Sequence, residues 1–247
     1  MLKSLLIQSP TKFYEAVPYF YIEAQKFGFL DKYYVTSDYA SDSELGSNCY
    51  FHRLEKDRQF SSNMLDLLKH VNEDVFFVCC EDHVFRPKNT HAMWQQCWDF
   101  VVDNQDVGYL RLTNNNRVEF DTKGRKDFIL PMKRSYKYYI SLQPGIWRRE
   151  YLELALKSGE DAWKFEINGA KRCREHKGLR SYCVRETIFH HTNFFKGGKY
   201  YRHKFAEYAI DNGFALKSDR KIHWKGGTYG FEEYRSMYKK RQEGVKS

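Results

Sequence analysis

The chain has 247 residues, of which 42% are hydrophobic and 17% aromatic, so it is long and apolar enough to bury the core of one large domain. It lacks an apolar stretch near the ~18 residues that a membrane span requires, and its start has too short an apolar core for a signal peptide. Its six cysteines, at positions 49, 79, 80, 97, 173 and 183, form neither a CxxC pair nor a zinc-ligand spacing. We therefore expect a reduced protein of the cytoplasm, or of the host cytoplasm if the source is viral.

The excess positive charge is confined to the second half of the chain. Residues 1–130 contain 15 Lys and Arg against 19 Asp and Glu, whereas residues 131–247 contain 26 against 13. This asymmetry predicts an anionic partner for the second half, such as nucleotide phosphates, nucleic acid or an acidic glycan. The alternative is a basic surface that serves only solubility.

Strands and helices alternate along the first half. The hydrophobic pattern predicts strands over residues 3–8, 32–36, 49–54, 75–80 and 107–112. It predicts one helix within residues 13–27, interrupted or begun near Pro18, a second that starts at a cap on Ser61 or Ser62, and a third capped by Thr90. This alternation indicates an α/β fold with an open, mainly parallel sheet flanked by helices.

The second half differs from the first in its residue pattern. Residues 113–126 are polar and predict a hairpin or a mobile loop. We expect a strand over residues 138–142, helices over 145–157 and 162–175, short strands or loops from 182 to 201, and helices over 204–211 and 231–242. Since no repeat or linker separates the halves, we predict a single domain with a basic carboxyl-terminal extension.

Residues 75–85, VFFVCCEDHVF, form the centre of the predicted sheet. Six apolar or thiol residues run without a break into Glu81, Asp82 and His83, as in a strand buried on both faces. Such a strand ends at the carboxyl edge, where open α/β sheets bind ligands. Carboxylates crowded there require a cation, so the sequence predicts a divalent ion that carries a phosphate. The alternative is that Glu81 and Asp82 only cap the next turn.

Three further segments follow this strand in a fixed order. They are VGYLRL at 107–112, SLQPGIW at 141–147 and WKFE at 163–166. In this order and spacing the chain resembles, over roughly residues 1–175, a group of bacterial and viral nucleotide-sugar glycosyltransferases with the GT-A fold. SLQPGIW and WKFE are the specific part of the resemblance. The acidic motif of GT-A enzymes is often Asp-x-Asp or Asp-Asp, from which Glu81-Asp82-His83 departs.

The resemblance implies a GT-A-like, Rossmann-type sheet and transfer of a sugar from a nucleotide-sugar donor. It implies that Asp82, with Glu81 or His83, holds manganese or magnesium against the donor diphosphate. For an inverting enzyme it implies a general base that activates the acceptor hydroxyl, with Glu166 as first candidate and Asp161 as second. Together with the charge asymmetry, it leads us to expect a nucleotide-sugar-binding half over residues 1–130 and a basic acceptor-binding half over residues 131–247.

Residues at the ends of the first two strands are candidate contacts of the donor nucleoside. Ser9 follows the first strand, and Thr36, Ser37 and Asp38 end the second, so a parallel sheet would bring all four to the edge where a uridine-type base and ribose bind. Arg111 is a candidate contact of the donor or of the acceptor. Each of these residues has an alternative role in an ordinary turn or at the surface.

The last third of the chain interleaves basic residues with aromatic rings, at 196–204 and again at 220–225. This pattern suits nucleic acid, because phosphates bind the cations and unstacked bases bind the rings. Carbohydrate sites also use aromatic rings, so the rings alone do not choose. Viruses with hydroxymethylated DNA bases attach sugars to them with transferases, so the resemblance implies, as the first hypothesis for the acceptor, a hydroxymethylated base in viral DNA, flipped outward and held by tyrosines or by Trp224. The alternatives are a glycan, a lipid-linked sugar or a protein side chain.

Two functions of other classes remain open. A non-catalytic nucleic-acid-binding α/β protein would share the basic half but would have no need for acids at the end of the central strand. A nucleotidyltransferase would also use strand-end acids and a metal ion. Such enzymes usually carry a Gly-rich phosphate loop near the first strand, and residues 5–14 contain no glycine.

Overall fold

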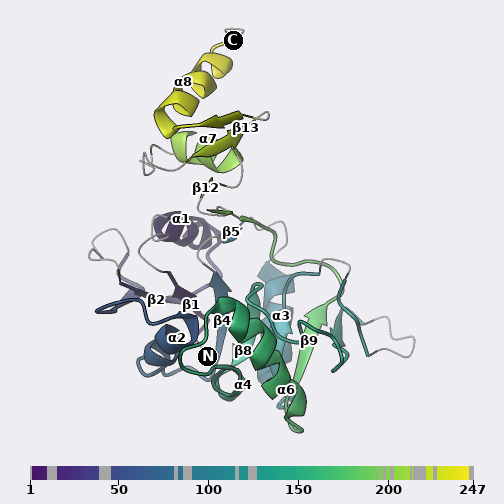
Figure 1. Cartoon of the computed structure of the whole chain (residues 1–247). Helices are drawn as coiled ribbons and strands as arrows, with labels where there is room; N and C mark the ends of the chain where they lie inside the picture. The colour runs from purple at the N-terminus through teal and green to yellow at the C-terminus, as the bar shows by residue number, and fades with distance from the viewer. Residues whose placement is uncertain are drawn as a thin grey trace. The chain divides into compact units, whose positions relative to one another are not determined.

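The computed structural model describes residues 2–9, 16–38, 46–80, 83–85, 91–114, 117–121, 127–193, 195–196, 199–200, 203–211, 213, 221–224 and 227–244 (Figure 1). Of these, residues 84, 85, 192, 193, 195, 196, 199, 200, 203–205 and 223 are described by their backbone alone. The chain forms two compact units, Met1–Glu81 with Phe85–His191, and Asp82–Val84 with Thr192–Ser247. No helix in the described ranges has the length and hydrophobicity of a membrane span.

An eight-stranded sheet organises the first unit, in the order β3-β2-β1-β4-β8-β6-β9-β7. Its strands are β1 (Ser4–Gln8), β2 (Lys32–Ser37), β3 (Cys49–Arg53), β4 (Val75–Cys80), β6 (Val107–Arg111), β7 (Ile129–Pro131), β8 (Gly145–Arg148) and β9 (Arg180–Val184). Strands β3, β2, β1 and β4 are parallel, and so are β6 and β9. Strand β8 is antiparallel to its neighbours β4 and β6, and β7 is antiparallel to β9. The open, mainly parallel sheet expected from the sequence is therefore confirmed.

Helices cover both faces of this sheet and create two cores. Helices α1 (Val17–Phe27) and α3 (His91–Asp103) contribute to one core, whereas α2 (Phe60–Leu68), α4 (Arg149–Ala155), η2 (Phe165–Gly169) and α6 (Ala170–Glu175) contribute to the other. Strand β4 supplies Phe76 and Val78 to the second core, and Val75, Phe77 and Cys79 to the first. The central strand is thus buried on both faces, as its unbroken apolar sequence predicts.

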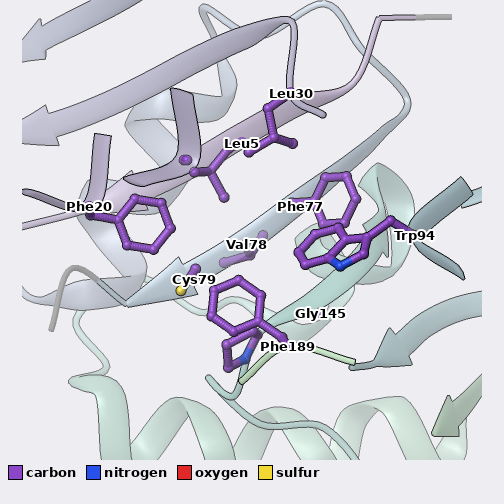
Figure 2. A pocket seen from close by; sticks show the side chains of 11 residues that line it. Leu5, Phe20, Leu30, Phe77, Val78, Cys79, Trp94, Gly145 and Phe189 are labelled. Carbon is purple, nitrogen blue, oxygen red and sulfur yellow. The ribbon is translucent and has the colours of Figure 1, made fainter. Parts of the chain in front are cut away.

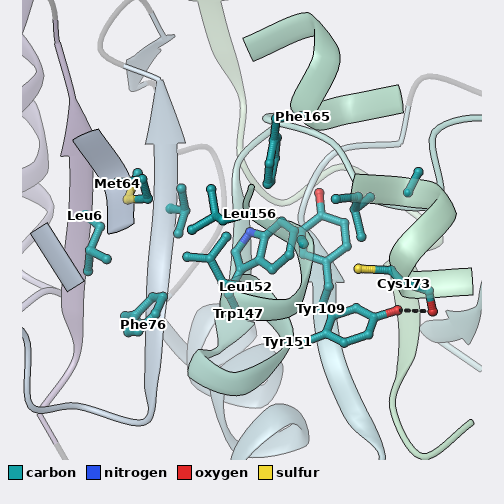
Figure 3. Packing of buried hydrophobic residues seen from close by; sticks show 14 of the residues in the cluster. Leu6, Met64, Phe76, Tyr109, Trp147, Tyr151, Leu152, Leu156, Phe165 and Cys173 are labelled. Carbon is teal, nitrogen blue, oxygen red and sulfur yellow. Dashed lines mark hydrogen bonds between the residues drawn. The ribbon is translucent and has the colours of Figure 1, made fainter. Parts of the chain in front are cut away.

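The core on the α4 side fixes the segment that carries the WKFE sequence (Figure 3). The ring of Trp147 on β8 lies 4.2 Å from that of Tyr109 on β6 and 6.2 Å from that of Phe165 on η2, measured between centroids. On the same side, the Tyr151 hydroxyl donates to the Cys173 carbonyl oxygen at 3.3 Å. Because Phe165 is fully buried here, the backbone at residue 166 is held in place relative to β8.

The opposite core contains a small apolar pocket, which Figure 2 shows between α1, α3 and the strands. None of its lining residues is charged; they are Leu5, Phe20, Ala24, Leu30, Phe77, Val78, Cys79, Trp94, Pro144, Gly145 and Phe189. Such a lining suits neither a diphosphate nor a sugar, since their polar groups would be buried without partners. The pocket is therefore part of the packing and not the ligand site.

The structure corrects three local predictions. Residues 138–142 form turns and bends, and the strand lies at Gly145–Arg148, where a helix was expected. Four residues are too few to show the alternation that marks a strand, and α4 follows directly, so the apolar spacing resembles one longer helix. Helix α2 begins at Phe60 with Gln59 as its N-cap, so Ser61 lies inside its first turn and caps nothing. Thr90 lies outside the described residues.

The second unit contains a four-stranded sheet in the order β11-β12-β13-β14 and two helices. The elements are β11 (Phe195–Lys196), β12 (Lys199–Tyr200), α7 (His203–Asp211), β13 (Ile222–Trp224), β14 (Gly227–Tyr229) and α8 (Phe231–Gln242). Strands β5 (His83–Phe85) and β10 (His191–Asn193) form a separate pair. The boundary between the units follows residue 191, whereas the two predicted functional halves meet at residue 130. Strands β8 and β9, which lie in the predicted acceptor-binding half, therefore belong to the first unit.

Candidate functional site

The carboxyl ends of β1, β2 and β4 meet at one edge of the sheet. Gln8, the last residue of β1, lies opposite Thr36 of β2 and Cys80 of β4. The Ser9 amide donates a hydrogen bond to the Thr36 carbonyl oxygen at 2.9 Å. The parallel strands therefore bring predicted donor contacts beside Cys80, the residue that precedes Glu81, at the edge where open α/β sheets bind ligands.

Two hydroxyl groups at this edge are buried without a partner. Ser9 and Thr36 are fully buried, and neither side-chain oxygen forms a hydrogen bond within the part of the chain that the structure describes. Ser37 is buried as well, and its carbonyl oxygen accepts from the Leu54 amide at 2.8 Å, whereas Asp38 is half-buried. Because unsatisfied buried hydroxyls are uncommon in folded proteins, this edge retains unused capacity for hydrogen bonding.

The segment before β8 lies at the same edge. Since β8 is antiparallel to β4 and β6, its amino end lies beside their carboxyl ends, and Gly145 is opposite both Val78 and Arg111. The Leu112 amide donates to the Pro144 carbonyl oxygen at 2.9 Å. A β-carbon at Gly145 would overlap the Tyr109 ring. The tertiary structure thus places the first part of SLQPGIW next to the ends of the parallel strands.

A polar network surrounds this segment. The Tyr109 hydroxyl lies 3.3 Å from the carbonyl oxygens of Ser141 and Gln143. Thr113 Oγ1 donates to Gln143 Oε1 at 3.3 Å and accepts from Arg111 Nε at 3.2 Å. Arg111 is only 4% exposed, and among the described residues this is the one hydrogen bond that its guanidinium makes. Its Nη atoms are therefore available to an anionic or polar ligand.

Glu166 is bonded to the same segment. Its Oε1 accepts a hydrogen bond from the Leu142 amide at 2.8 Å, and the side chain is half-buried. Burial raises the pKa of Glu166 above its usual range, while the Leu142 amide and the positive charge of Arg111 partly oppose that rise. Glu166 belongs to a five-residue π-helical turn, a form frequent at functional sites. The arrangement provides a carboxylate suited to accepting a proton.

Asp161, the second candidate for the base, has a different role in the structure. It is the N-cap of α5 (Ala162–Lys164), and its Oδ1 accepts from the Lys164 amide at 2.8 Å. Such a contact stabilises a helix start. One carboxylate oxygen of Asp161 is thus engaged in capping, which favours Glu166 as the base.

The three predicted metal ligands are only partly described. Glu81 and Asp82 lie outside the described residues. His83 on β5 is buried, and this burial lowers its pKa to about 3, so the imidazole is neutral at physiological pH. Where the structure gives side-chain positions, no group of three or more His, Cys, Asp or Glu residues could hold a metal ion. The metal assignment therefore stays a prediction.

Several solved structures share this architecture. A fragment of TarS from S. aureus superposes with a TM-score of 0.53 at 11% identity, over 76% of this chain and 59% of that one. The mannosyltransferase PcManGT from Pyrobaculum calidifontis, in complex with GDP-Man and Mn2+, gives 0.53 at 10% identity, over 85% and 60%. A UDP-glucose pyrophosphorylase from Acinetobacter baumanii gives 0.52 at 8% identity, over 78% and 88%.

At these identities the similarity establishes the fold alone. The protein has a GT-A-like α/β fold. It spans 59% of the TarS fragment and 60% of the mannosyltransferase. No protein-family model matches the sequence, and no curated protein matches it either. Transferases and pyrophosphorylases share the fold, so the choice between their activities depends on the residues at the sheet edge.

Tyr109, Thr113 and Gln143 belong to the site but were not anticipated from the sequence. Tyr109 lies in VGYLRL and Gln143 in SLQPGIW, so these segments are the sequence signal that marks their neighbourhood. No pattern could assign them to one network, because they come together only through the insertion of β8 beside β6.

Replacing Arg111 with glutamine is expected to shift the acid limb of the pH–rate profile to higher pH. The positive charge lowers the Glu166 pKa, so its removal lets that pKa rise further and the Glu166 carboxylate is protonated over a wider pH range. Loss of a charge-assisted contact to a bound ligand is also expected to reduce kcat/KM by about 10- to 100-fold. The measurement is kcat/KM against pH for both proteins.

Arg111→Lys provides the matched control, because it keeps the charge and loses the planar fork. Its acid limb should stay near that of the wild type. An unshifted limb in Arg111→Gln, in a variant with a normal thermal unfolding midpoint, would show that Arg111 does not act on Glu166.

Proposed function

We propose that this protein is a nucleotide-sugar-dependent glycosyltransferase in which Glu166 is the general base. The observation that carries the proposal is the Glu166 carboxylate, held at 2.8 Å by the Leu142 amide beside the sheet edge, with a raised pKa. A base works best when its pKa lies closer to the working pH than that of an ordinary glutamate. The match of WKFE to the glycosyltransferase group supports the same role.

The donor would lie along the carboxyl edge of the sheet. Neighbouring strands are about 4.8 Å apart, so the three steps from β1 through β4 and β8 to β6 span about 14 Å. This length accommodates a nucleoside near Ser9, Thr36, Ser37 and Asp38, a diphosphate near the end of β4, and a sugar near Arg111. The buried hydroxyls of Ser9 and Thr36 and the free Nη atoms of Arg111 fit a polar, anionic ligand of this kind.

Asp82, with Glu81 or His83, would hold a manganese or magnesium ion at the end of β4. Hard divalent ions prefer carboxylate oxygens, and the neutral imidazole of His83 is compatible with a ligand role. When bound, the ion would neutralise charge on the departing diphosphate. Arg111 adds a fixed positive charge near the Glu166 carboxylate.

The reaction of this site would be a single displacement. Glu166 removes the proton of the acceptor hydroxyl, and the hydroxyl oxygen bonds to the anomeric carbon of the sugar. The bond from that carbon to the diphosphate oxygen breaks, and its electron pair leaves with the nucleoside diphosphate. The Leu142 amide keeps the carboxylate oriented, so the orientation is set before the acceptor binds.

The acceptor that we propose is a hydroxymethylated base in DNA, and the positive charge of the chain supports a polyanionic partner. The carboxyl-terminal part of the second unit, residues 192–247, contains 13 Lys and Arg against six Asp and Glu. Within the described residues of this part, Tyr234 donates to Glu207 at 3.1 Å and Tyr238 donates to Asp211 at 2.9 Å. Glu207 and Glu232 also pair with Arg241 and Arg235, at 3.5 and 3.6 Å. The sequence of this part therefore carries about twice as many basic as acidic residues, a balance that supports a polyanionic partner.

Incubation with nucleotide sugars and hydroxymethylated DNA is expected to add one sugar to the modified base. A panel of UDP- and GDP-sugars, with and without manganese, is combined with hydroxymethylated or unmodified duplexes, and the digested nucleosides are analysed by mass spectrometry. We expect a hexose- or pentose-sized mass gain on the hydroxymethylated base alone. Binding should fall steeply as salt rises, because phosphate contacts release counterions.

The same assay separates the alternatives. Transfer to a glycan, a lipid-linked sugar or a peptide, without any gain on DNA, would overturn the DNA acceptor and leave the transferase in place. Release of pyrophosphate from a nucleoside triphosphate and a sugar 1-phosphate would instead indicate a nucleotidyltransferase, a function favoured by the fold shared with the UDP-glucose pyrophosphorylase. DNA binding without turnover of any donor would indicate a non-catalytic protein.

A further inference from the structure

Trp163 is a large aromatic side chain that the fold leaves in solvent. Its exposed fraction is 74%, whereas Trp94, Trp98 and Trp147 are at most 3% exposed. Trp224, the remaining tryptophan, is half-buried and packs against Tyr229 and Tyr234. All five tryptophans are described, and among them only Trp163 presents most of its ring to solvent. The expectation that Trp224 holds a flipped base is thereby weakened.

The backbone under Trp163 is fixed, so its exposure is not that of a loose loop. The Asp161 carboxylate caps α5 through the Lys164 amide, and the Phe165 amide donates to the Asp161 carbonyl oxygen at 2.9 Å. Phe165 is anchored in the core. Just before the cap, Glu160 pairs with Arg172 at 2.6 Å. An exposed indole on such a rigid support is a ready surface for stacking.

Trp163 lies close to Glu166 in the sequence, so a ligand stacked on the indole would be near the Glu166 carboxylate. The two residues are three apart on a continuous helical segment, so their backbones are about 4.5 Å apart along the axis. Glu166 lies at the sheet edge through its bond to Leu142. Lys164, between them, is exposed as well. An aromatic ring next to a cation is the combination that binds an unstacked nucleotide, with the base on the ring and the phosphate at the cation.

We propose that Trp163 is the platform on which the acceptor base stacks, with its hydroxymethyl group toward Glu166. This inference rests on the proposed function and specifies which residue recognises the acceptor. The stacked ring would be a pyrimidine flipped from the duplex, because a base inside the stack cannot reach Glu166. Trp163 therefore determines affinity for the base, whereas the exposed Lys164 contributes affinity for the phosphate.

The test compares two oligonucleotides that differ only at one position. One carries a hydroxymethylated cytosine within a short single strand, and the other carries an abasic site there. Fluorescence anisotropy gives the Kd of each, and their ratio cancels the phosphate contacts. In the wild type we expect the base to tighten binding by about 10- to 100-fold. In Trp163→Ala the two Kd values should agree within about twofold, and Trp163→Phe should retain most of the preference, because a smaller ring still stacks.

Tyr50→Ala is the matched control, since Tyr50 is another exposed aromatic residue, at 39%, on the edge strand β3. Its Kd ratio should equal that of the wild type. A spectroscopic readout is independent of catalysis: the hydroxymethylated oligonucleotide should protect wild-type tryptophan emission from acrylamide, and this protection should be absent in Trp163→Phe. An unchanged Kd ratio in Trp163→Ala would overturn the proposal, and so would protection by an oligosaccharide but not by the oligonucleotide.

Turnover separates this inference from the proposed function. If the wild type transfers sugar to DNA and Trp163→Ala has an unchanged KM for the acceptor, the inference fails and the transferase stands. If the wild type transfers sugar to no acceptor but base-dependent binding disappears in Trp163→Ala, the base-binding role stands and the proposed reaction fails.

Discussion

Glu166→Gln is expected to reduce kcat by about 10²- to 10⁴-fold while the Kd for the donor stays within about twofold of the wild-type value. Glutamine keeps a side-chain oxygen that can accept from the Leu142 amide, so the segment stays in place and only the ability to take a proton is lost. The measurement combines transfer kinetics at saturating donor with calorimetric donor binding.

The pH dependence follows from the direction of the Glu166 pKa. Glu166 must be deprotonated to act as a base, and its pKa is raised by burial. The rate should therefore fall, as pH decreases, at a higher pH than an ordinary glutamate would give, and this acid limb should be absent from the residual activity of Glu166→Gln. Stability changes with pH in the opposite direction. The protonated carboxyl of Glu166 contributes to the free energy of unfolding at low pH, and this contribution is lost as pH rises through the folded-state pKa.

Asp161→Asn is the control for this assignment. Asparagine also caps helices, so it preserves α5, and the variant should transfer sugar at a rate close to that of the wild type. The opposite pattern, with an inactive Asp161→Asn and an active Glu166→Gln, would show that the base is Asp161.

Asp82→Asn is expected to lower kcat by about 100-fold or more, because it removes the charge that would, under the proposed function, hold a metal ion against the departing diphosphate. The change is nearly isosteric, so we expect the thermal unfolding midpoint to remain close to that of the wild type. The measurement is turnover at saturating donor over a titration of manganese and of magnesium. The wild type should saturate at lower metal concentration than the variant.

Cys80→Ser, one position before the acidic pair, provides the comparison for Asp82→Asn. Cys80 donates to the Leu142 carbonyl oxygen at 3.7 Å, a contact that a hydroxyl can also make, so this variant should keep the metal dependence of the wild type. Near wild-type turnover by Asp82→Asn at every metal concentration would exclude Asp82 as a ligand of the ion or of the diphosphate.

Much of this molecule is determined locally by its sequence. The run from Val75 to Cys80 is apolar without a break, a pattern typical of a strand covered on both faces, and the structure places it in such a strand. Pro18 fixes the start of α1, because proline lacks an amide hydrogen and is tolerated in the first turn. The ends of parallel strands meet at one edge, so Ser9 and Thr36 become neighbours once β1 and β2 pair.

The tertiary structure decided the rest. Strand β8 is four residues long, and its antiparallel position between β4 and β6 depends on partners far away in the sequence. The insertion of β8 places the Leu142 amide where it can donate a hydrogen bond to Glu166. The same insertion buries Arg111 beside these two residues. A local pattern reports which face of an element is apolar, but it carries no information about which distant strand supplies the neighbouring hydrogen bonds. The fold class could therefore be predicted from the sequence, whereas the contacts among Leu142, Glu166 and Arg111 depend on the tertiary structure that brings these segments together.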